Sequence, residues 1–137
     1  IHAALWGKLA FMAANSGVGA ITRVPSGQWR SLAGSWEMAQ QVVKEVLAVA
    51  SAKGIDMPGD AFPSTIARLE GSPQDGTSSM QRDLMDGKPS ELEVQSGGVV
   101  RLGLEVGVPT PVNTFIYHSL LPQEMKARAE SSNRDPG

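Results

Sequence analysis

Helical periodicity runs through most of this chain, and no stretch alternates strictly between apolar and polar residues. Apolar residues spaced three and four apart share one side of an α-helix, whereas a half-buried strand needs a period of two. Leu5, Leu9 and Met12 show the helical spacing near the N-terminus, and Val42 and Val46 belong to a longer apolar stripe further on. The sequence therefore predicts an all-α fold.

The helices can be placed from this periodicity and from the residues at their ends. We expect them over 3–14, 35–53, 61–70, 78–86, 90–107 and from about 115 onward. Gly17 and Gly19 are expected to end or kink the first helix because glycine costs helix stability, and Pro122 to break the last one. Ser35 is a candidate cap for the second helix, and Gly54 suits a Schellman stop at its end.

Two helix starts carry a capping-box pattern. Ser78 is followed by Gln81, and Ser90 is followed by Glu93, in each case three residues later. In such a box the hydroxyl accepts from a backbone N–H, and the longer side chain returns to the N–H of the capping residue. We therefore predict that helices begin at both serines.

The composition fits one globular domain without disulfides. The chain has 137 residues, no cysteine, and 12 basic against 14 acidic side chains. Without cysteine it has no disulfide framework, no zinc-finger spacing and no thiol nucleophile, and the cytoplasm is the expected compartment. A helical domain is expected over residues 1–129, followed by a polar tail over 130–137 that frays.

Several partners are disfavoured by the same composition. The basic residues form no run that could follow a phosphate backbone, so no nucleic acid is expected. No apolar stretch reaches the roughly 20 residues of a bilayer span, so no membrane is expected either. His2 and His118 stand at opposite ends of the chain without other ligand types nearby, so no metal site is predicted. The N-terminus lacks an initiator Met and a signal-peptide pattern, so the chain is expected to start partway into a longer protein.

Lys8 is the first candidate for chemistry. Met12 and Ser16 follow it four and eight residues later, so the three share one helix face if the helix persists that far. Such a face presents a cation and a polar group to one ligand. The alternative is a solvated surface lysine, which spacing by itself favours.

Ser79 and Glu91 are the other candidates. Ser79 stands one position inside the helix capped by Ser78, where free N–H groups and the helix dipole favour an anion such as a carboxylate. Glu91 follows Ser90 and is left free to act elsewhere if Glu93 completes the capping box. A purely capping or dipole-related role is the alternative for both residues.

Taken in order, several motifs resemble the C-terminal domain of the ketopantoate reductase (2-dehydropantoate 2-reductase) family. They are Trp6-x-Lys8-Leu9-x-Phe11, Ser78-Ser79-Met80-x-x-Asp83, Gly87-x-x-x-Glu91, Gly97-x-Val99-Val100-Arg101 and Gly107-Val108-Pro109-Thr110-Pro111-Val112-Asn113. The resemblance covers about residues 5–124. It implies a multi-helix substrate and dimerisation domain of the 6-phosphogluconate dehydrogenase C-terminal-like type.

The resemblance also implies a function. The whole enzyme would be an NADPH-dependent oxidoreductase of pantothenate biosynthesis, reducing ketopantoate or another small 2-keto acid, with NADPH bound mainly by an N-terminal Rossmann domain that this chain lacks. Lys8 would be the general acid, Glu91 would contact substrate and hold the lysine in its charged form, and Ser79 would bind substrate. The fragment alone would be inactive. Its expected partners are the substrate, its own Rossmann domain and a second copy in a homodimer.

The chain departs from the family pattern at positions that usually hold asparagine. Met12 and Ser16 occupy the positions four and eight residues after the lysine, Asn15 stands one place early, and Ser96 replaces the asparagine before a glycine. Met12, Asn15 and Ser16 are therefore candidate substrate-binding residues, and a related but less hydroxylated 2-keto acid is the alternative to ketopantoate as substrate. The alternative to an enzyme is a non-catalytic helical module for dimerisation or small-molecule binding.

Overall fold

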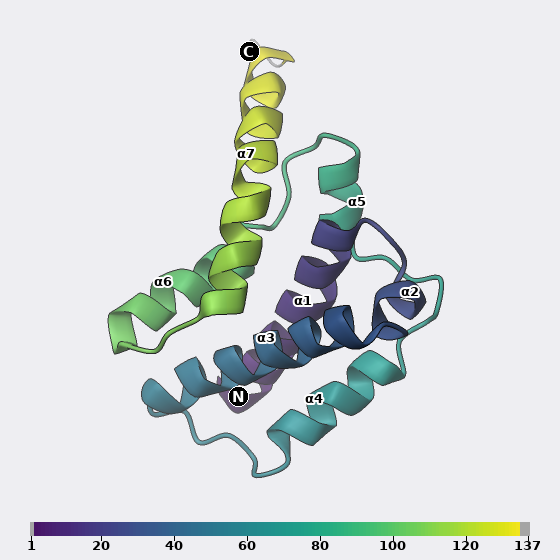
Figure 1. Cartoon of the computed structure of the whole chain (residues 1–137). Coiled ribbons are helices and arrows are strands. Elements are labelled where there is room, and N and C mark those ends of the chain that lie inside the picture. The colour runs from purple at the N-terminus through teal and green to yellow at the C-terminus, as the bar shows by residue number, and fades with distance from the viewer. Residues whose placement is uncertain (1, 135–137) are drawn as a thin grey trace.

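The computed structural model describes residues 2–134, and these form helices joined by turns, with no strand among them. The elements are α1 (His2–Thr22), α2 (Ser26–Arg30), α3 (Ala33–Ala52), α4 (Ala61–Glu70), α5 (Ser79–Met85), α6 (Ser96–Val106) and α7 (Pro111–Arg134). The all-α prediction is confirmed. Figure 1 shows α1 in the middle of the bundle, with α7 extending beyond the other helices toward the C-terminus.

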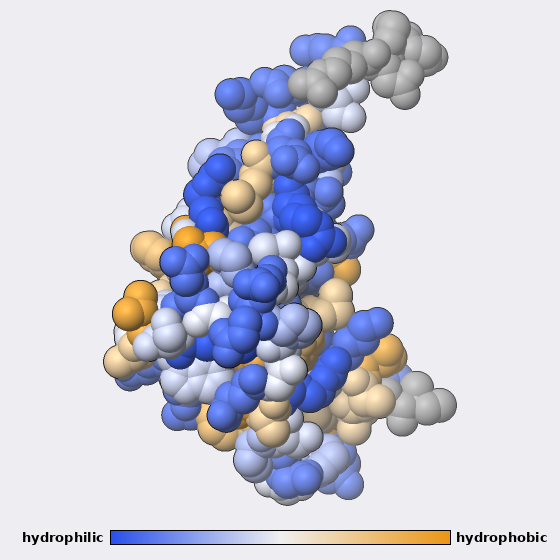
Figure 2. Space-filling view, turned by 90° about the vertical axis from the view of Figure 1, so that its right-hand side faces the viewer, coloured by the Kyte–Doolittle hydropathy of each residue, from blue (hydrophilic) through white to orange (hydrophobic). Residues whose placement is uncertain are grey.

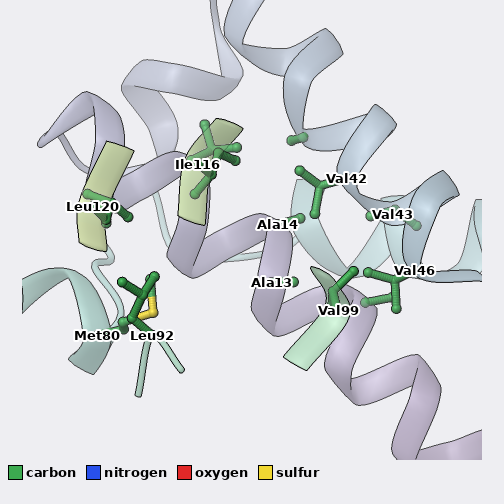
Figure 3. Close-up of a cluster of buried hydrophobic side chains, with 14 of the residues drawn as sticks. Ala13, Ala14, Val42, Val43, Val46, Met80, Leu92, Val99, Ile116 and Leu120 are labelled. Carbon is green, nitrogen blue, oxygen red and sulfur yellow. The ribbon is translucent and has the colours of Figure 1, made fainter. Parts of the chain in front are cut away.

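The core forms where α1 packs on α3. The residues of α1 at this contact are small, which lets the two backbones approach closely. Ala13 and Ala14 lie opposite Val42 and Val46 of α3, and all four are at most 1% exposed (Figure 3). A second part of the core contains Met80, Leu92, Leu120 and Ile116.

The predicted kink at Gly17 and Gly19 is wrong, because α1 continues to Thr22. Both glycines are buried beneath other elements. A Cβ on Gly17 would lie 3.2 Å from the Cγ2 atom of Ile116, and one on Gly19 would lie inside the Gln81 side chain. The glycines therefore allow close packing on α1, and the burial gained there outweighs their weak helix propensity.

The predictions for the two ends of α3 have different outcomes. Ser35 does not cap the helix, which begins at Ala33, and its hydroxyl donates to the Trp29 carbonyl oxygen at 2.7 Å instead. The Schellman stop is confirmed. Gly54 has a φ of +82°, and the N–H of Ile55 donates to the Ala50 carbonyl oxygen at 3.0 Å.

The two predicted capping boxes also have different outcomes. Ser78 caps α5, because its hydroxyl accepts from the Gln81 N–H at 3.0 Å, but the Gln81 amide donates to the Val24 carbonyl oxygen and does not complete the box. The prediction at Ser90 is wrong, since residues 91–95 form a turn and the helix begins only at Ser96. The Ser90 hydroxyl pairs with the buried Glu124 carboxylate, which competes with the local cap.

The last helix is longer and more continuous than predicted. Pro122 lies inside α7 without breaking it, and the helix continues to Arg134. Pro122 is exposed, so the carbonyl that loses its helical hydrogen bond can bond to water. Residues 130–134 of the predicted tail are thus helical, and residues 135–137 lie outside the described part of the chain.

The start of α7 is held by a buried carboxylate from α3. Glu45 is 3% exposed and accepts from the N–H of Val112 and the N–H of Asn113, both at 3.0 Å, and from the Asn113 amide at 2.8 Å. Acceptors at a helix N-terminus satisfy free N–H groups and interact favourably with the helix dipole. The motif Pro111-Val112-Asn113 therefore joins α7 to α3.

The surface is mainly polar on the face that Figure 2 shows, with apolar residues in small separate patches. Among residues 2–134, no helix is long and apolar enough to cross a membrane. The same residues contain no group of three His, Asp or Glu side chains that could hold a metal ion.

Candidate functional site

One face of α1 carries several of the residues singled out from the sequence. Because the helix is unbroken and has about 3.6 residues per turn, Lys8, Met12, Asn15 and Gly19 follow one line along it. Lys8 and Asn15 are two turns apart, a rise of about 10 Å between their Cα atoms. The line thus runs from a cation through an apolar side chain to an amide.

Lys8 is exposed and lines an open cavity of about 300 Å³. The cavity lies between the first turns of α1, the turn before α4, and α4 itself. Arg68 of α4 borders it and places its guanidinium 4.3 Å from the centre of the Phe11 ring. This cation–π contact fixes α4 beside the Lys8 face of α1.

Met12, Asn15 and Ser16 differ in how far they reach the surface. Met12 and Asn15 are partly buried, whereas Ser16 is only 3% exposed. Ser16 follows Asn15 by one residue and so points about 100° away from it around the helix. Of the three, Met12 and Asn15 reach the surface, and neither lines the cavity beside Lys8.

Asn15 has a partner that the sequence analysis did not identify. The Ser26 hydroxyl, at the start of α2, donates to the Asn15 amide oxygen at 3.2 Å and lies 3.1 Å from the Gly76 carbonyl oxygen. Ser26 itself is 3% exposed. No periodic or motif signal marks it, because it meets Asn15 only when α2 folds back along α1.

The first turn of α5 lies at the far end of the same α1 face. Gln81 covers Gly19, and its amide donates to the Val24 carbonyl oxygen at 3.0 Å. Ser79 lies two residues earlier, is exposed, and is followed by Met80, which is fully buried. The structure therefore brings the start of α5, with Ser79, against the α1 helix that carries Lys8.

Glu91 is exposed on the turn between α5 and α6. The residue before it, Ser90, is held by α7. Its N–H donates to both carboxylate oxygens of Glu124, at 3.0 and 3.1 Å, and Arg128 donates to the same carboxylate at 2.8 Å. The residue after it, Leu92, is fully buried in the core near Met80 (Figure 3). Glu91 thus projects from a backbone fixed on both sides.

A second carboxylate follows on that turn. Glu93 accepts from the Tyr117 hydroxyl at 2.7 Å and from the Arg101 guanidinium at 2.9 Å. The hydrogen bond from Tyr117 is the main cause of a lowered pKa of Glu93, assisted by Arg101, and the same bond raises the pKa of Tyr117. Glu93 therefore braces the turn against α6 and α7 and does not complete a cap at Ser90.

The convergence of Lys8, Ser79 and Glu91 in one cleft stays a prediction. The cavity beside Lys8 is bordered by α1, α4 and the turn between α3 and α4, and neither Ser79 nor Glu91 lines it. All three side chains are exposed, and the residues next to Ser79 and Glu91 meet in one part of the core.

Comparison with known proteins identifies the family. The family model described as "Ketopantoate reductase PanE/ApbA C terminal" matches residues 1–124. The chain belongs to the ketopantoate reductase family. This membership confirms the resemblance seen in the motifs and supports the enzyme over the non-catalytic module.

Individual relatives agree with the family match. The 2-dehydropantoate 2-reductase of Pyrobaculum aerophilum is 32% identical over 119 residues, which are 87% of this chain and 42% of that protein. The crystal structure of a PanE/ApbA family ketopantoate reductase from Ralstonia eutropha superposes with a TM-score of 0.82 at 32% identity, covering 92% of this chain and 42% of that one.

A more distant structure shares the fold. The ternary structure of D-mandelate dehydrogenase with NADH and anilino(oxo)acetate gives a TM-score of 0.82 at 23% identity, over 93% of this chain and 42% of that one. In all three comparisons the chain spans well under half the length of the protein that it matches.

Proposed function

We propose that these residues form the substrate-binding and catalytic C-terminal domain of an NADPH-dependent 2-keto acid reductase, with ketopantoate or a close analogue as substrate. The observation that carries the proposal is the family match over residues 1–124, within which Lys8, Ser79 and Glu91 are all exposed. Their exposure leaves all three side chains accessible to a ligand, and their convergence on one ligand is part of the proposal.

Lys8 would act as the general acid. NADPH, when bound, supplies a hydride to the keto carbon. As negative charge develops on the keto oxygen, an ammonium group at hydrogen-bond distance stabilises it and then donates a proton, which yields the hydroxy acid. Glu91 would favour the charged form of the lysine, because a nearby carboxylate stabilises an ammonium.

The substrate carboxylate would bind at the start of α5. Ser79 is the first residue of that helix and offers a hydroxyl beside the free N–H groups of the first turn. The described residues contain no strand followed by a glycine-rich loop, so we place most of the NADPH site in the part of the protein outside this chain.

The test is steady-state kinetics on the full-length protein that carries these residues, with NADPH and a panel of 2-keto acids. We expect turnover of at least one keto acid, and Lys8→Ala should lower kcat by about 10²–10⁴-fold because proton donation is lost. Lys126→Ala, which removes an exposed lysine of α7, is the matched control and should leave kcat unchanged. Residues 1–137 alone should reduce none of the panel.

Two results would contradict the proposal. The first is a full-length protein that oxidises NADPH with none of the keto acids tested. The second is an active protein in which Lys8→Ala has the same kcat as the parent for every substrate.

A further inference from the structure

We propose that Glu124, buried on α7, is a positioning residue for the reductase reaction, because it fixes the segment of main chain from which Glu91 projects. This inference rests on the proposed function and extends it to a residue that touches neither the substrate nor the cofactor. Glu124 acts through Ser90, the residue before Glu91, with Arg128 as its partner.

Glu124 holds the polar groups of Ser90. Its side chain is 0% exposed, and its carboxylate accepts from the Ser90 N–H at 3.0 and 3.1 Å and from the Ser90 hydroxyl. The Arg128 guanidinium donates to the same carboxylate at 2.8 Å. Hydrogen bonds to a charged group are short and directional, so these donors fix the carboxylate and Ser90 together.

Both peptide groups that flank the Cα atom of Glu91 are anchored by the same cluster. The carbonyl oxygen of Ser90, in the peptide group before Glu91, accepts from Arg128 at 3.3 Å. The N–H of Leu92, in the peptide group after Glu91, donates to the Ser90 hydroxyl at 3.2 Å. Because each peptide group is planar, anchoring the two groups sets the position of the Glu91 Cα and the direction of its side chain.

The rest of the turn is equally well fixed, whereas the Glu91 carboxylate is free. The Glu91 carbonyl oxygen accepts from the N–H groups of Val94 and Gln95, at 3.1 and 3.0 Å. The Leu92 side chain is fully buried. The Glu91 side chain is exposed and has no hydrogen bond or ion pair with residues 2–134. The fold thus fixes the main chain of a residue whose carboxylate is left for a ligand.

Stability by itself is a weak reason for a charge at this place. Burial of an ion pair costs desolvation free energy, and apolar residues of similar volume often replace such a pair without loss. The apolar core lies next to Glu124, since Leu120, one turn earlier on α7, is 2% exposed. The carboxylate supplies acceptors for the Ser90 N–H and hydroxyl, which an apolar side chain cannot do. The cluster therefore serves the orientation of the turn.

The orientation of Glu91 matters for the proposed chemistry. In that chemistry Glu91 stabilises the ammonium group of Lys8, which donates a proton to the keto oxygen. The interaction between two charges depends on their distance, and misplacement of a catalytic group by about 1 Å can cost about 10²-fold in rate. Loosening of the Glu124 cluster should therefore lower kcat without weakening the binding of NADPH.

The experiment is a double-mutant cycle on the full-length protein that carries these residues, with NADPH and the 2-keto acid of the panel that it reduces fastest. Glu124→Gln keeps the shape of the side chain and one acceptor oxygen. It should lower kcat by about threefold to tenfold and leave the KM for NADPH unchanged. In protein that already carries Glu91→Gln, the same change should lower kcat by less than about twofold, because Glu124 acts only through Glu91.

Variants of Ser90 test the cluster without a change at Glu124. Ser90→Ala removes the hydroxyl that accepts from Leu92 and should also lower kcat, whereas Ser90→Thr keeps a hydroxyl and should restore it. Asn113→Ala is the matched control for lost stability, because it removes a buried hydrogen bond of 2.8 Å to another carboxylate, that of Glu45. It should lower the unfolding temperature and leave kcat unchanged. Thermal unfolding shows that each variant is folded at the assay temperature.

The inference and the proposed function fail in different ways. A full-length protein that reduces no keto acid contradicts the proposed function, and the inference with it. An active protein in which Glu91→Gln leaves kcat unchanged removes the role of Glu91 on which the inference depends. If folded Glu124→Gln protein has the parent kcat, or loses the same factor with and without Glu91→Gln, the positioning role of Glu124 is overturned and the reductase remains.

Discussion

Removal of the Glu124 side chain should strongly destabilise this fold. It lies on α7 with 0% exposure, and its carboxylate accepts from the Ser90 N–H, the Ser90 hydroxyl and the Arg128 guanidinium. These bonds join the segment before α6, which carries Glu91, to the last helix.

The magnitude of the loss can be worked out from these partners. Glu124→Ala leaves two donors of Ser90, itself 8% exposed, without an acceptor, at about 1–3 kcal/mol each. Arg128 contributes little, because its side chain is 49% exposed and returns to water. We therefore expect a loss of about 2–6 kcal/mol in the free energy of unfolding.

Urea denaturation at neutral pH, followed by circular dichroism, measures this loss. Glu124→Gln keeps one acceptor oxygen for Ser90 and should cost less, about 1–2 kcal/mol. Gln123→Ala truncates the exposed neighbour on the same helix and should stay within about 0.5 kcal/mol of the parent. The reasoning is refuted if Glu124→Ala is no more destabilising than Gln123→Ala.

Two further predictions concern α6 and its contacts. Gly98→Ala should raise the free energy of unfolding by up to about 1 kcal/mol, because the nearest atom to a Cβ there is 4.0 Å away. Gly103→Ala should lower the free energy of unfolding, because its Cβ would lie 2.9 Å from the Val108 carbonyl oxygen. Urea denaturation of the two variants tests both signs. Tyr117→Phe should destabilise the protein near pH 7. That difference should shrink as pH falls below about 4.5, since a lowered pKa of Glu93 gives stability that is lost on protonation, and a difference independent of pH in acid titration would contradict the link.

The sequence predicted the helical class and several helix ends because those features depend on local interactions. Amphipathic periodicity marks which side of a helix can be buried, and it located α3 and α4 within two residues of their observed bounds. The Gly54 stop and the Ser78 cap were also correct, since each needs only hydrogen bonds between residues a few positions apart.

The wrong predictions share a physical cause, which is competition from distant partners. Gly17 and Gly19 do not break α1 because Ile116 and Gln81 pack against them. Ser90 does not start a helix because Glu124, 34 residues away, takes its N–H and hydroxyl. A local pattern carries no information about such partners.

The candidate site also has features that the sequence predicts and features that depend on distant partners. The sequence by itself determined the family, because ordered motifs at fixed spacing identify it without any contact being known, and the same motifs predict Lys8, Ser79 and Glu91 as site residues. Only the tertiary structure decided that Ser16 is buried and that Asn15 stands on the Lys8 face with Ser26 as its partner. Which of two adjacent side chains reaches a ligand depends on the rotation of α1 against its neighbours. That rotation is set by burial of the opposite face of α1 on α3 and α7. Residues throughout the chain contribute to the free energy of this burial.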